Sequence, residues 1–395
     1  MISEKMTSLG QKRSVIREIF EYGRKRKSEI GADNVFDFSL GNPSVPAPPC
    51  VEKAMQKLLA ENSPVAIHGY TSAQGDLSVR QKISAYINKT HGTKLDENNI
   101  YMTCGAAASL CISLRALTAS SDDEFITFTP FFPEYRVFVE AAGAKLTSVA
   151  SNPKNFQIDF DNLAKAINKN TKGIIINSPN NPSGVVLSEK TILRLCEMLA
   201  QKQKEYNHEI YLIADEPYRE LVYDGISVPY PINYYDNTII CYSFSKSLSL
   251  PGERIGYIVV SDKMNDGETV YAAICGAGRA LGYVCAPSMF QKVVAECQGQ
   301  TSDLSIYVKN RDLLYSALER FGYHCIHPDG AFYLFFETPE TDANAFCERA
   351  KKYELLLVPG DDFGCPSFVR IAYCVSTEQI EKSLPAFEKL MKEYK

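Results

Sequence analysis

The residue with the clearest chemical potential is Lys246, which stands among small hydroxyl residues in the segment 243–254, directly after the apolar, β-rich run 238–242. That run predicts a buried strand, and an open α/β sheet binds its ligands at the carboxyl ends of its strands. A lysine there can form a Schiff base with a carbonyl when burial or a neighbouring cation makes its neutral form accessible. Groups suited to an anion surround it: Ser243, Ser245 and Arg254. The alternative is a solvated lysine and arginine that flank a Ser-rich loop.

Polar residues follow two other apolar runs, as Asn-Ser-Pro-Asn-Asn-Pro-Ser-Gly at 177–184 and as Asp-Glu-Pro-Tyr at 215–218. An aspartate at a buried strand end needs a positive partner, because burial would otherwise protonate it. A pyridinium nitrogen is such a partner for Asp215, and Asn181 and Tyr218 can each donate to an oxygen on the same ring. Taken singly, Asp215 is also a plausible helix N-cap and the Asn/Pro run a tight turn. All three patterns in this order favour one site.

An anion site is also predicted at residues 101–110, which read as a strand, a turn of small residues and a helix. Small side chains at Gly105, Ala106 and Ala107 let backbone N–H groups approach an anion, and the helix dipole assists them. Close packing of the alanines against a sheet is the alternative.

The elements that must position these residues alternate along the chain, which predicts an α/β fold with a mostly parallel sheet covered by helices on both faces. We expect a large domain with a seven-stranded sheet and a smaller α/β C-terminal domain, divided as an arm and part of the small domain at 1–48, the large domain at 49–285 and the small domain at 286–395. Strands are expected at 36–40, from 101, and at 125–128, 145–149, 173–177, 210–214, 238–242, 255–260, 332–336, 355–358 and 368–372. Helices are expected at 12–27, 49–60, 77–88, 133–142, 188–203 and 287–321.

Composition excludes several classes of protein. The chain has 395 residues and a formal net charge of −5 without a long basic run, which argues against a nucleic-acid partner. Neither a signal peptide nor an apolar run of membrane length is found, and the 12 cysteines form no Cys-x-x-Cys pair, so we expect a cytoplasmic protein with reduced thiols and no membrane association. His324 and His327 lack the neighbours of a metal site, and no metal is expected.

The sequence resembles the aspartate aminotransferase family, the class I/II aminotransferases of fold type I, from about Phe36 to Tyr373. The most specific matches are the segments 177–184 and 215–218 and the pattern S-x-S-K-x-x-x-x-P-G-x-R-x-G at 243–256. The resemblance implies pyridoxal 5'-phosphate as cofactor and a homodimer with two sites at its interface. It also implies cis peptide bonds before Pro182 and Pro130.

The resemblance assigns a role to each candidate residue. Lys246 would hold the cofactor covalently and serve as the catalytic base, and Asp215 would pair with the pyridine nitrogen. Asn181 and Tyr218 would bind the ring oxygen, with Tyr218 counted among the catalytic residues. Phosphate would be bound by Gly105, Ala106, Ala107, Ser243, Ser245, Arg254 and Tyr70 of the neighbouring subunit. The remaining matches are Phe132, which would stack on the ring, Arg370, which would grip the substrate α-carboxylate, and Gly41, which would approach the substrate; Asn181 would also contact the substrate.

Departures from the family pattern leave the substrate side chain open. Ala107 and Ala108 replace a hydroxyl and a polar residue that relatives often carry, so a lysine that reads acidic substrates is missing, and Ala73 replaces a proline. Arg279, in a Gly-rich stretch read as a loop, lies near the position of a cross-subunit arginine that binds a distal carboxylate. A solvated arginine is the alternative.

The predicted activity is transfer of an amino group between an L-amino acid and a 2-oxo acid. A carbon–sulfur β-lyase or another elimination or decarboxylation enzyme of the same fold is the first alternative, because fold and cofactor do not determine the reaction. A ligand-sensing regulator on this fold is the second, and the roughly 35 residues before Phe36 are too few for an added DNA-binding domain.

Overall fold

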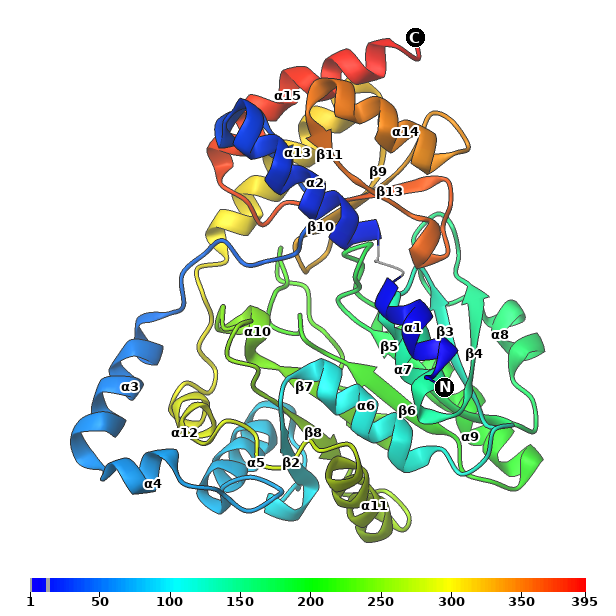
Figure 1. Ribbon diagram of the computed structural model, residues 1–395. Coiled ribbons are helices and arrows are strands. Elements are labelled where there is room, and N and C mark those ends of the chain that lie inside the picture. The colour runs from blue at the N-terminus through cyan, green and yellow to red at the C-terminus, as the bar shows by residue number, and fades with distance from the viewer. Residues whose placement is uncertain (1, 12–14) are drawn as a thin grey trace.

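The computed structural model describes residues 2–11 and 15–395, and it contains one large sheet and a smaller C-terminal body (Figure 1). The large sheet has seven strands in the order β2-β8-β7-β6-β5-β3-β4. Only β8 runs antiparallel to its neighbours β2 and β7, and the other pairs are parallel. The strands are β2 Ile100–Thr103, β3 Glu124–Thr129, β4 Lys145–Ala150, β5 Thr171–Asn177, β6 Tyr211–Asp215, β7 Thr238–Ser243 and β8 Gly256–Val260. The mostly parallel seven-stranded sheet is therefore confirmed.

Both faces of this sheet are buried, which explains why its strands read as continuous apolar runs. Alternate residues of each strand point to opposite faces, so Ile175 and Ile213 pack on one face and Ile174 and Leu212 on the other. The first face is covered by α6 Ala106–Leu117, α7 Glu134–Ala142 and α11 Gly267–Ala280. The second face is covered by α3 Pro49–Glu61, α5 Leu77–His91, α8 Phe160–Ala166, α9 Glu189–Tyr206 and α12 Ser288–Glu296.

The C-terminal body has a four-stranded sheet in the order β12-β13-β10-β9, with a separate parallel pair β1-β11. Its strands are β1 Phe36–Asp37, β9 His324–Ile326, β10 Tyr333–Glu337, β11 Leu355–Leu356, β12 Val358–Pro359 and β13 Phe368–Ala372. The main helices here are α13 Ser305–Phe321, α14 Ala343–Ala350 and α15 Thr377–Lys392, which lie above the large sheet in Figure 1. Shorter helices complete the chain: α1 Glu4–Gln11, α4 Pro64–His68 and α10 Phe244–Ser247.

The helix expected in the N-terminal arm is present, with different bounds. The expected helix at 12–27 corresponds to α2 Val15–Ile30, and residues 12–14 lie outside the described residues. Ile19 of α2 packs against Leu356 and Val358 of the C-terminal body. The arm therefore joins the small sheet before the chain enters the large one.

Three expected elements are wrong in extent. The single helix at 287–321 is two helices, α12 and α13, because the chain turns at Gly299, whose φ of 77° lies in the left-handed region. The strand at 355–358 is divided between β11 and β12, which pair with different strands, and the strand at 36–40 ends at Asp37. Helix α12 falls in the range predicted for the small domain, yet it packs against α3, α4 and α5 of the large one. The predicted division at residue 285 stays a prediction, and this packing favours a later boundary.

Candidate active site

The carboxyl ends of three adjacent strands bring the predicted residues together. Asn177 ends β5, Asp215 ends β6 and Ser243 ends β7, directly before the short helix that carries Lys246. The register pairs Asn177 with Asp215, so these side-chain positions are neighbours across the ladder. They line a cavity of about 370 Å³ together with residues of the N-terminal arm and the C-terminal body.

Asp215 is a buried carboxylate with one unsatisfied oxygen. Its Oδ2 accepts a hydrogen bond of 2.5 Å from the Tyr135 hydroxyl, whereas its Oδ1 has no partner among the described residues. Burial, assisted by the charge of Glu216, raises the pKa of this carboxyl from 3.8 to about 7, against the Tyr135 hydrogen bond, which lowers it. Asp215 lines the cavity, and no donor or cation among the described residues stabilises a charge on Oδ1.

Lys246 is a buried amine whose proton is held weakly. Burial above all, together with the charges of Arg254 and Arg370 and against the effect of Cys374, lowers its pKa from 10.5 to about 8. Its Nζ donates to the Gly41 carbonyl at 2.7 Å. A neutral fraction that is accessible near neutral pH lets this amine act as a nucleophile and a base.

An anion cradle lies at the start of α6, where the chain turns at Gly105. Gly105 has a φ of 87°, and a Cβ there would lie 3.0 Å from Nη2 of Arg254, so a side chain would intrude on the guanidinium. Ala106 and Ala107 begin the helix and line the cavity. The dipole of α6 and the Arg254 charge both favour an anion here.

The Ser243 hydroxyl lies on the same side of the cavity. It is within 2.7 Å of the Ser245 hydroxyl, and both serines line the cavity. Its oxygen also accepts from the Ser245 N–H as the cap of α10. Both serines are thus preorganised next to Lys246.

Arg370 supplies the second arginine of the cavity, from β13 of the C-terminal body. Its Nη1 donates to Asn181 Oδ1 at 3.1 Å and its Nη2 to the Ser39 carbonyl at 2.5 Å. Its Nε is buried and has no hydrogen-bond partner in residues 2–11 and 15–395. A buried guanidinium with free donor capacity is suited to a carboxylate.

Two tyrosines connect the two sides of the cavity. The hydroxyl groups of Tyr218 and Tyr333 lie 2.9 Å apart. The Tyr333 ring lies under the Arg370 guanidinium at 4.8 Å, and its hydroxyl would be 2.0 Å from a Cβ at Gly41. Gly41 must therefore be a glycine for the arm to approach Tyr333 and Lys246 closely.

Sequence reasoning missed Tyr135, Tyr333, Ser39 and Glu134, all of which contact or line the site. Tyr333 follows a buried aromatic residue and reads as core, and Ser39 contributes only its carbonyl. Tyr135 and Glu134 begin a helix directly after the Pro130–Pro133 turn, and a titratable residue beside the expected ring-stacking Phe132 was the available signal. Phe132 itself lines the cavity, and its stacking on a ring stays a prediction.

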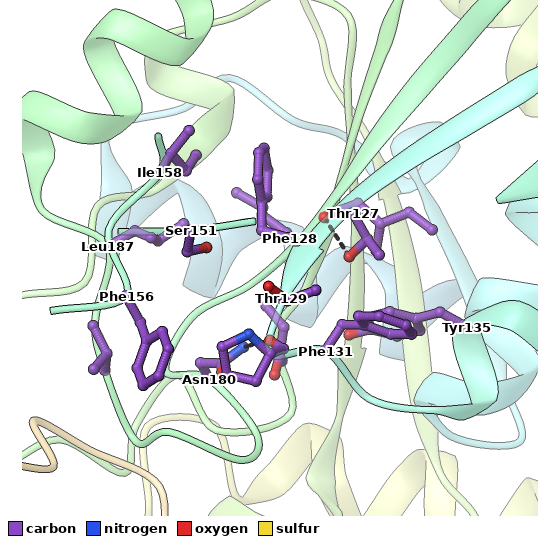
Figure 2. A pocket seen from close by; sticks show the side chains of 15 residues that line it. Thr127, Phe128, Thr129, Phe131, Tyr135, Ser151, Phe156, Ile158, Asn180 and Leu187 are labelled. Carbon is purple, nitrogen blue, oxygen red and sulfur yellow. Dashed lines mark hydrogen bonds between the residues drawn. The ribbon is translucent and has the colours of Figure 1, made fainter. Parts of the chain in front are cut away.

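A second, smaller cavity of about 30 Å³ has Asn177 and Tyr135 among its lining residues (Figure 2). Figure 2 shows Thr127, Phe128 and Tyr135 around it, with Ser151 and Asn180 adding polar groups. This volume holds a water or two rather than a cofactor, since one water needs about 10–15 Å³ of such volume. The larger cavity is therefore the candidate active site.

The two residues assigned across a subunit boundary lie outside the cavity of their own chain. Tyr70 follows α4 and is 99% exposed. Arg279 lies in the last turn of α11 and is exposed, so the expected loop is wrong: alanines around the glycines sustain a helix. Their cross-subunit roles stay predictions.

The peptide bonds before Pro130 and Pro182 are cis, as predicted, and the bond between Ser178 and Pro179 is also cis, which was not predicted. None of the described helices combines the length and apolar composition of a membrane span. Residues 2–11 and 15–395 contain no group of three metal-ligating side chains.

The residues present fit a phosphorylated pyridine aldehyde. The orphaned Oδ1 of Asp215 matches a protonated ring nitrogen, Lys246 matches an aldehyde, and the cradle of Gly105 and Arg254 matches a phosphate. Arg370 remains for a substrate carboxylate. Fold and site together define an enzyme of amino-acid chemistry.

Comparison with known proteins agrees with an enzyme of amino-acid chemistry. The model of the family "Aminotransferase class I and II" matches residues 33–387, and the chain belongs to this family. A probable aspartate aminotransferase from Methanocaldococcus jannaschii is 30% identical over 97% of this chain and 98% of its own length. The crystal structure of an aminotransferase from Eubacterium rectale is 58% identical, with a TM-score of 0.98 over 100% of this chain and 99% of that one. The structure of aspartate aminotransferase from Thermotoga maritima is 26% identical, with a TM-score of 0.87 over 99% of this chain and 100% of that one.

The protein is accordingly a transaminase of fold type I, which moves an amino group between an amino acid and a 2-oxo acid. The lyase alternative receives no support from these relatives, and membership of the family implies pyridoxal phosphate.

Proposed function

We propose that the protein is a pyridoxal 5'-phosphate-dependent aminotransferase whose site is the 370 Å³ cavity between the large sheet and the C-terminal body. The observation that carries this proposal is the convergence of a weakly basic lysine, an orphaned buried carboxylate and two arginines on that cavity. Lys246 would hold the cofactor aldehyde, Asp215 the ring nitrogen, and Asn181 and Tyr218 the ring oxygen. Phe132 would stack on the ring.

Phosphate would be held at the start of α6. The backbone N–H groups of Gly105, Ala106 and Ala107 and the Arg254 guanidinium would bind it, with the hydroxyls of Ser243 and Ser245. Both alanines lack a polar side chain, so backbone donors and Arg254 carry more of the binding. No metal is needed for this arrangement.

The residues of this chain divide the reaction between them. The bound cofactor supplies an electron sink for the electron pair left at the substrate Cα. Lys246 Nζ, displaced by the substrate amine, takes the Cα proton as general base, which its lowered pKa of about 8 permits near neutral pH. Asp215, ionised once it faces a cation, keeps the ring nitrogen protonated. Arg370 binds the α-carboxylate and orients the Cα–H bond toward Lys246, while Gly41 leaves room for the substrate.

The substrates we propose are an L-amino acid and a 2-oxo acid. We propose neither a nucleic acid nor a membrane as a partner. Relatives named aspartate aminotransferase make an acidic pair one candidate, for which Arg279 of a second subunit would bind the distal carboxylate, whereas the cavity lining of this single chain includes the acid Glu134 and favours another side chain. The exposed position of Arg279 on α11 leaves it available to a neighbouring chain.

We further infer a cytoplasmic homodimer. Apolar side chains that are exposed in the single chain occur around Tyr70, namely Leu59, Val65, Leu77, Leu281, Tyr283 and Val284. A symmetric interface over these residues would bury them and bring Tyr70 to the phosphate of the partner. All cysteines are free thiols, which suits a reducing compartment.

The experiment is a titration of cofactor-free protein with pyridoxal phosphate, followed by addition of an amino acid and by light scattering. We expect a visible absorbance with one cofactor bound per chain, and we expect the amino acid to bleach it. Light scattering should give the mass of a dimer. A protein that binds no pyridoxal phosphate, or an active monomer, would contradict the proposal in its cofactor or its dimer part respectively.

A further inference from the structure

The outer wall of the active-site cavity differs in character from its inner end. The inner end holds the three cations among its described lining residues, Lys246, Arg254 and Arg370. The outer lining includes Ile16 of α2, Leu40, which is 44% exposed, and Glu134 at the first position of α7. A substrate with its α-carboxylate on Arg370 therefore extends its side chain toward an apolar wall that carries one acid.

Each of the three inner cations already donates at least one hydrogen bond within the chain. Lys246 donates to the Gly41 carbonyl, Arg254 donates to the Pro251 carbonyl at 2.9 Å beside Gly105, and Arg370 is bound to Asn181 and Ser39. The buried Nε of Arg370 has no hydrogen-bond partner within the described chain, which suits it to a ligand carboxylate. Under the proposed function, Lys246 and Arg254 hold the cofactor and Arg370 holds the α-carboxylate, so none of the three is left for a second carboxylate at the far end of a substrate.

Glu134 is half-buried and is engaged in no hydrogen bond or ion pair within the described residues, although it lines the cavity. Burial first, and then the charge of Asp362 from the C-terminal body, raises the pKa of its carboxyl. Two acids close enough to interact, as Glu134 and Asp362 are, repel an anion and attract a cation. The nearby apolar side chains of Ile16 and Leu40 would cover an aliphatic stem.

We propose that Glu134 is a specificity-determining residue, which binds the distal cation of an amino donor with a basic side chain and disfavours dicarboxylic donors. The proposal rests on the proposed aminotransferase function and names its substrate class. In it, Arg370 and Glu134 read the two ends of the donor: the α-carboxylate and a distal ammonium or guanidinium group. The aliphatic chain between them lies against Ile16 and Leu40.

The test compares kcat/KM of the holoenzyme for lysine, for norleucine, which has the same chain without the charge, and for glutamate. We expect the wild type to prefer lysine to norleucine by about tenfold, a typical gain for a partly desolvated ion pair. Glu134→Gln should lower kcat/KM for lysine about tenfold, mainly through KM, and leave norleucine within about twofold. Glu134→Lys should raise kcat/KM for glutamate.

Glu197→Gln, an exposed glutamate of α9 that lies outside the cavity lining, is the matched control and should change none of the three values. Equal use of lysine and norleucine by the wild type, or an equal loss for all donors in Glu134→Gln, overturns the assignment of Glu134. In both outcomes norleucine still reacts, so the proposed function stands. Failure of every donor with cofactor-loaded wild type would instead contradict the function itself.

Discussion

Replacing Asp215 with asparagine should stabilise the cofactor-free protein near neutral pH. It should give no such stabilisation to the cofactor-loaded protein. In the cofactor-free state the carboxyl is buried, its Oδ1 has no partner among the described residues, and its pKa is raised to about 7. The native state therefore binds the proton more tightly than the unfolded chain, where the pKa is 3.8. The resulting stabilisation is present below pH 3.8 and is lost as the pH rises through 7.

The size of this effect follows from the two pKa values. Their separation, from 3.8 to about 7, corresponds to about 4 kcal/mol at about 1.4 kcal/mol per pH unit. Asparagine has no charge to bury and keeps an oxygen that can accept from Tyr135. With an unfolding entropy of about 2.1 cal/mol/K per residue over 395 residues, 4 kcal/mol corresponds to about 5 °C in Tm.

The assay is thermal unfolding of cofactor-free wild type and Asp215→Asn between pH 4 and pH 8. The Tm of the variant relative to wild type should rise by up to about 5 °C across this range. In the cofactor-loaded proteins this advantage should vanish, because the pyridinium nitrogen pairs with the wild-type carboxylate, and turnover should fall strongly in the variant. Asp236→Asn, an exposed site before β7, is the control. A Tm difference that does not change with pH in the cofactor-free proteins would refute the reasoning.

Three further substitutions test other parts of the site. Lys246→Ala should bind pyridoxal phosphate weakly, without a borohydride-reducible adduct, and should lose nearly all transamination; a reducible adduct in that variant contradicts the assignment. Arg370→Gln should lower kcat/KM for amino acids by about 2–5 kcal/mol in transition-state free energy and leave the slow reaction of amines without a carboxylate unchanged. Equal losses for both substrates count against its role. Gly105→Ala should lower the free energy of unfolding by about 1–2 kcal/mol, because a side chain at φ 87° is strained and approaches Arg254. The variant should weaken binding of pyridoxal phosphate and spare pyridoxal, and unchanged phosphate selectivity argues against the cradle.

The large sheet was predictable because its strands are buried on both faces and appear as uninterrupted apolar runs. The polar residues at their ends had to meet, since parallel strands end at the same edge of the sheet. The convergence of Asp215, Lys246, Asn181 and Arg254 on one cavity could therefore be predicted from the amino-acid sequence alone.

The C-terminal body was less predictable because its strands are short and its pairings are distant in sequence. Phe36 pairs with Leu355, and no local pattern carries that information. Tyr333 joins Tyr218 across 115 positions of the chain, and Glu134 acquires significance only once Ile16 and Leu40 line the same cavity. Side-chain roles that depend on such long-range contacts require the folded structure.

The central claim, transamination at Lys246, is tested most directly by a single half-reaction. Cofactor-loaded protein is mixed with an amino acid in the absence of any 2-oxo acid, and the products are quantified. We predict one equivalent of 2-oxo acid per site, no ammonia, and conversion of the cofactor to its amine form, which a second 2-oxo acid reverses. Continuous release of ammonia and 2-oxo acid, with the cofactor left in its aldehyde form, would contradict the claim and indicate an elimination reaction instead.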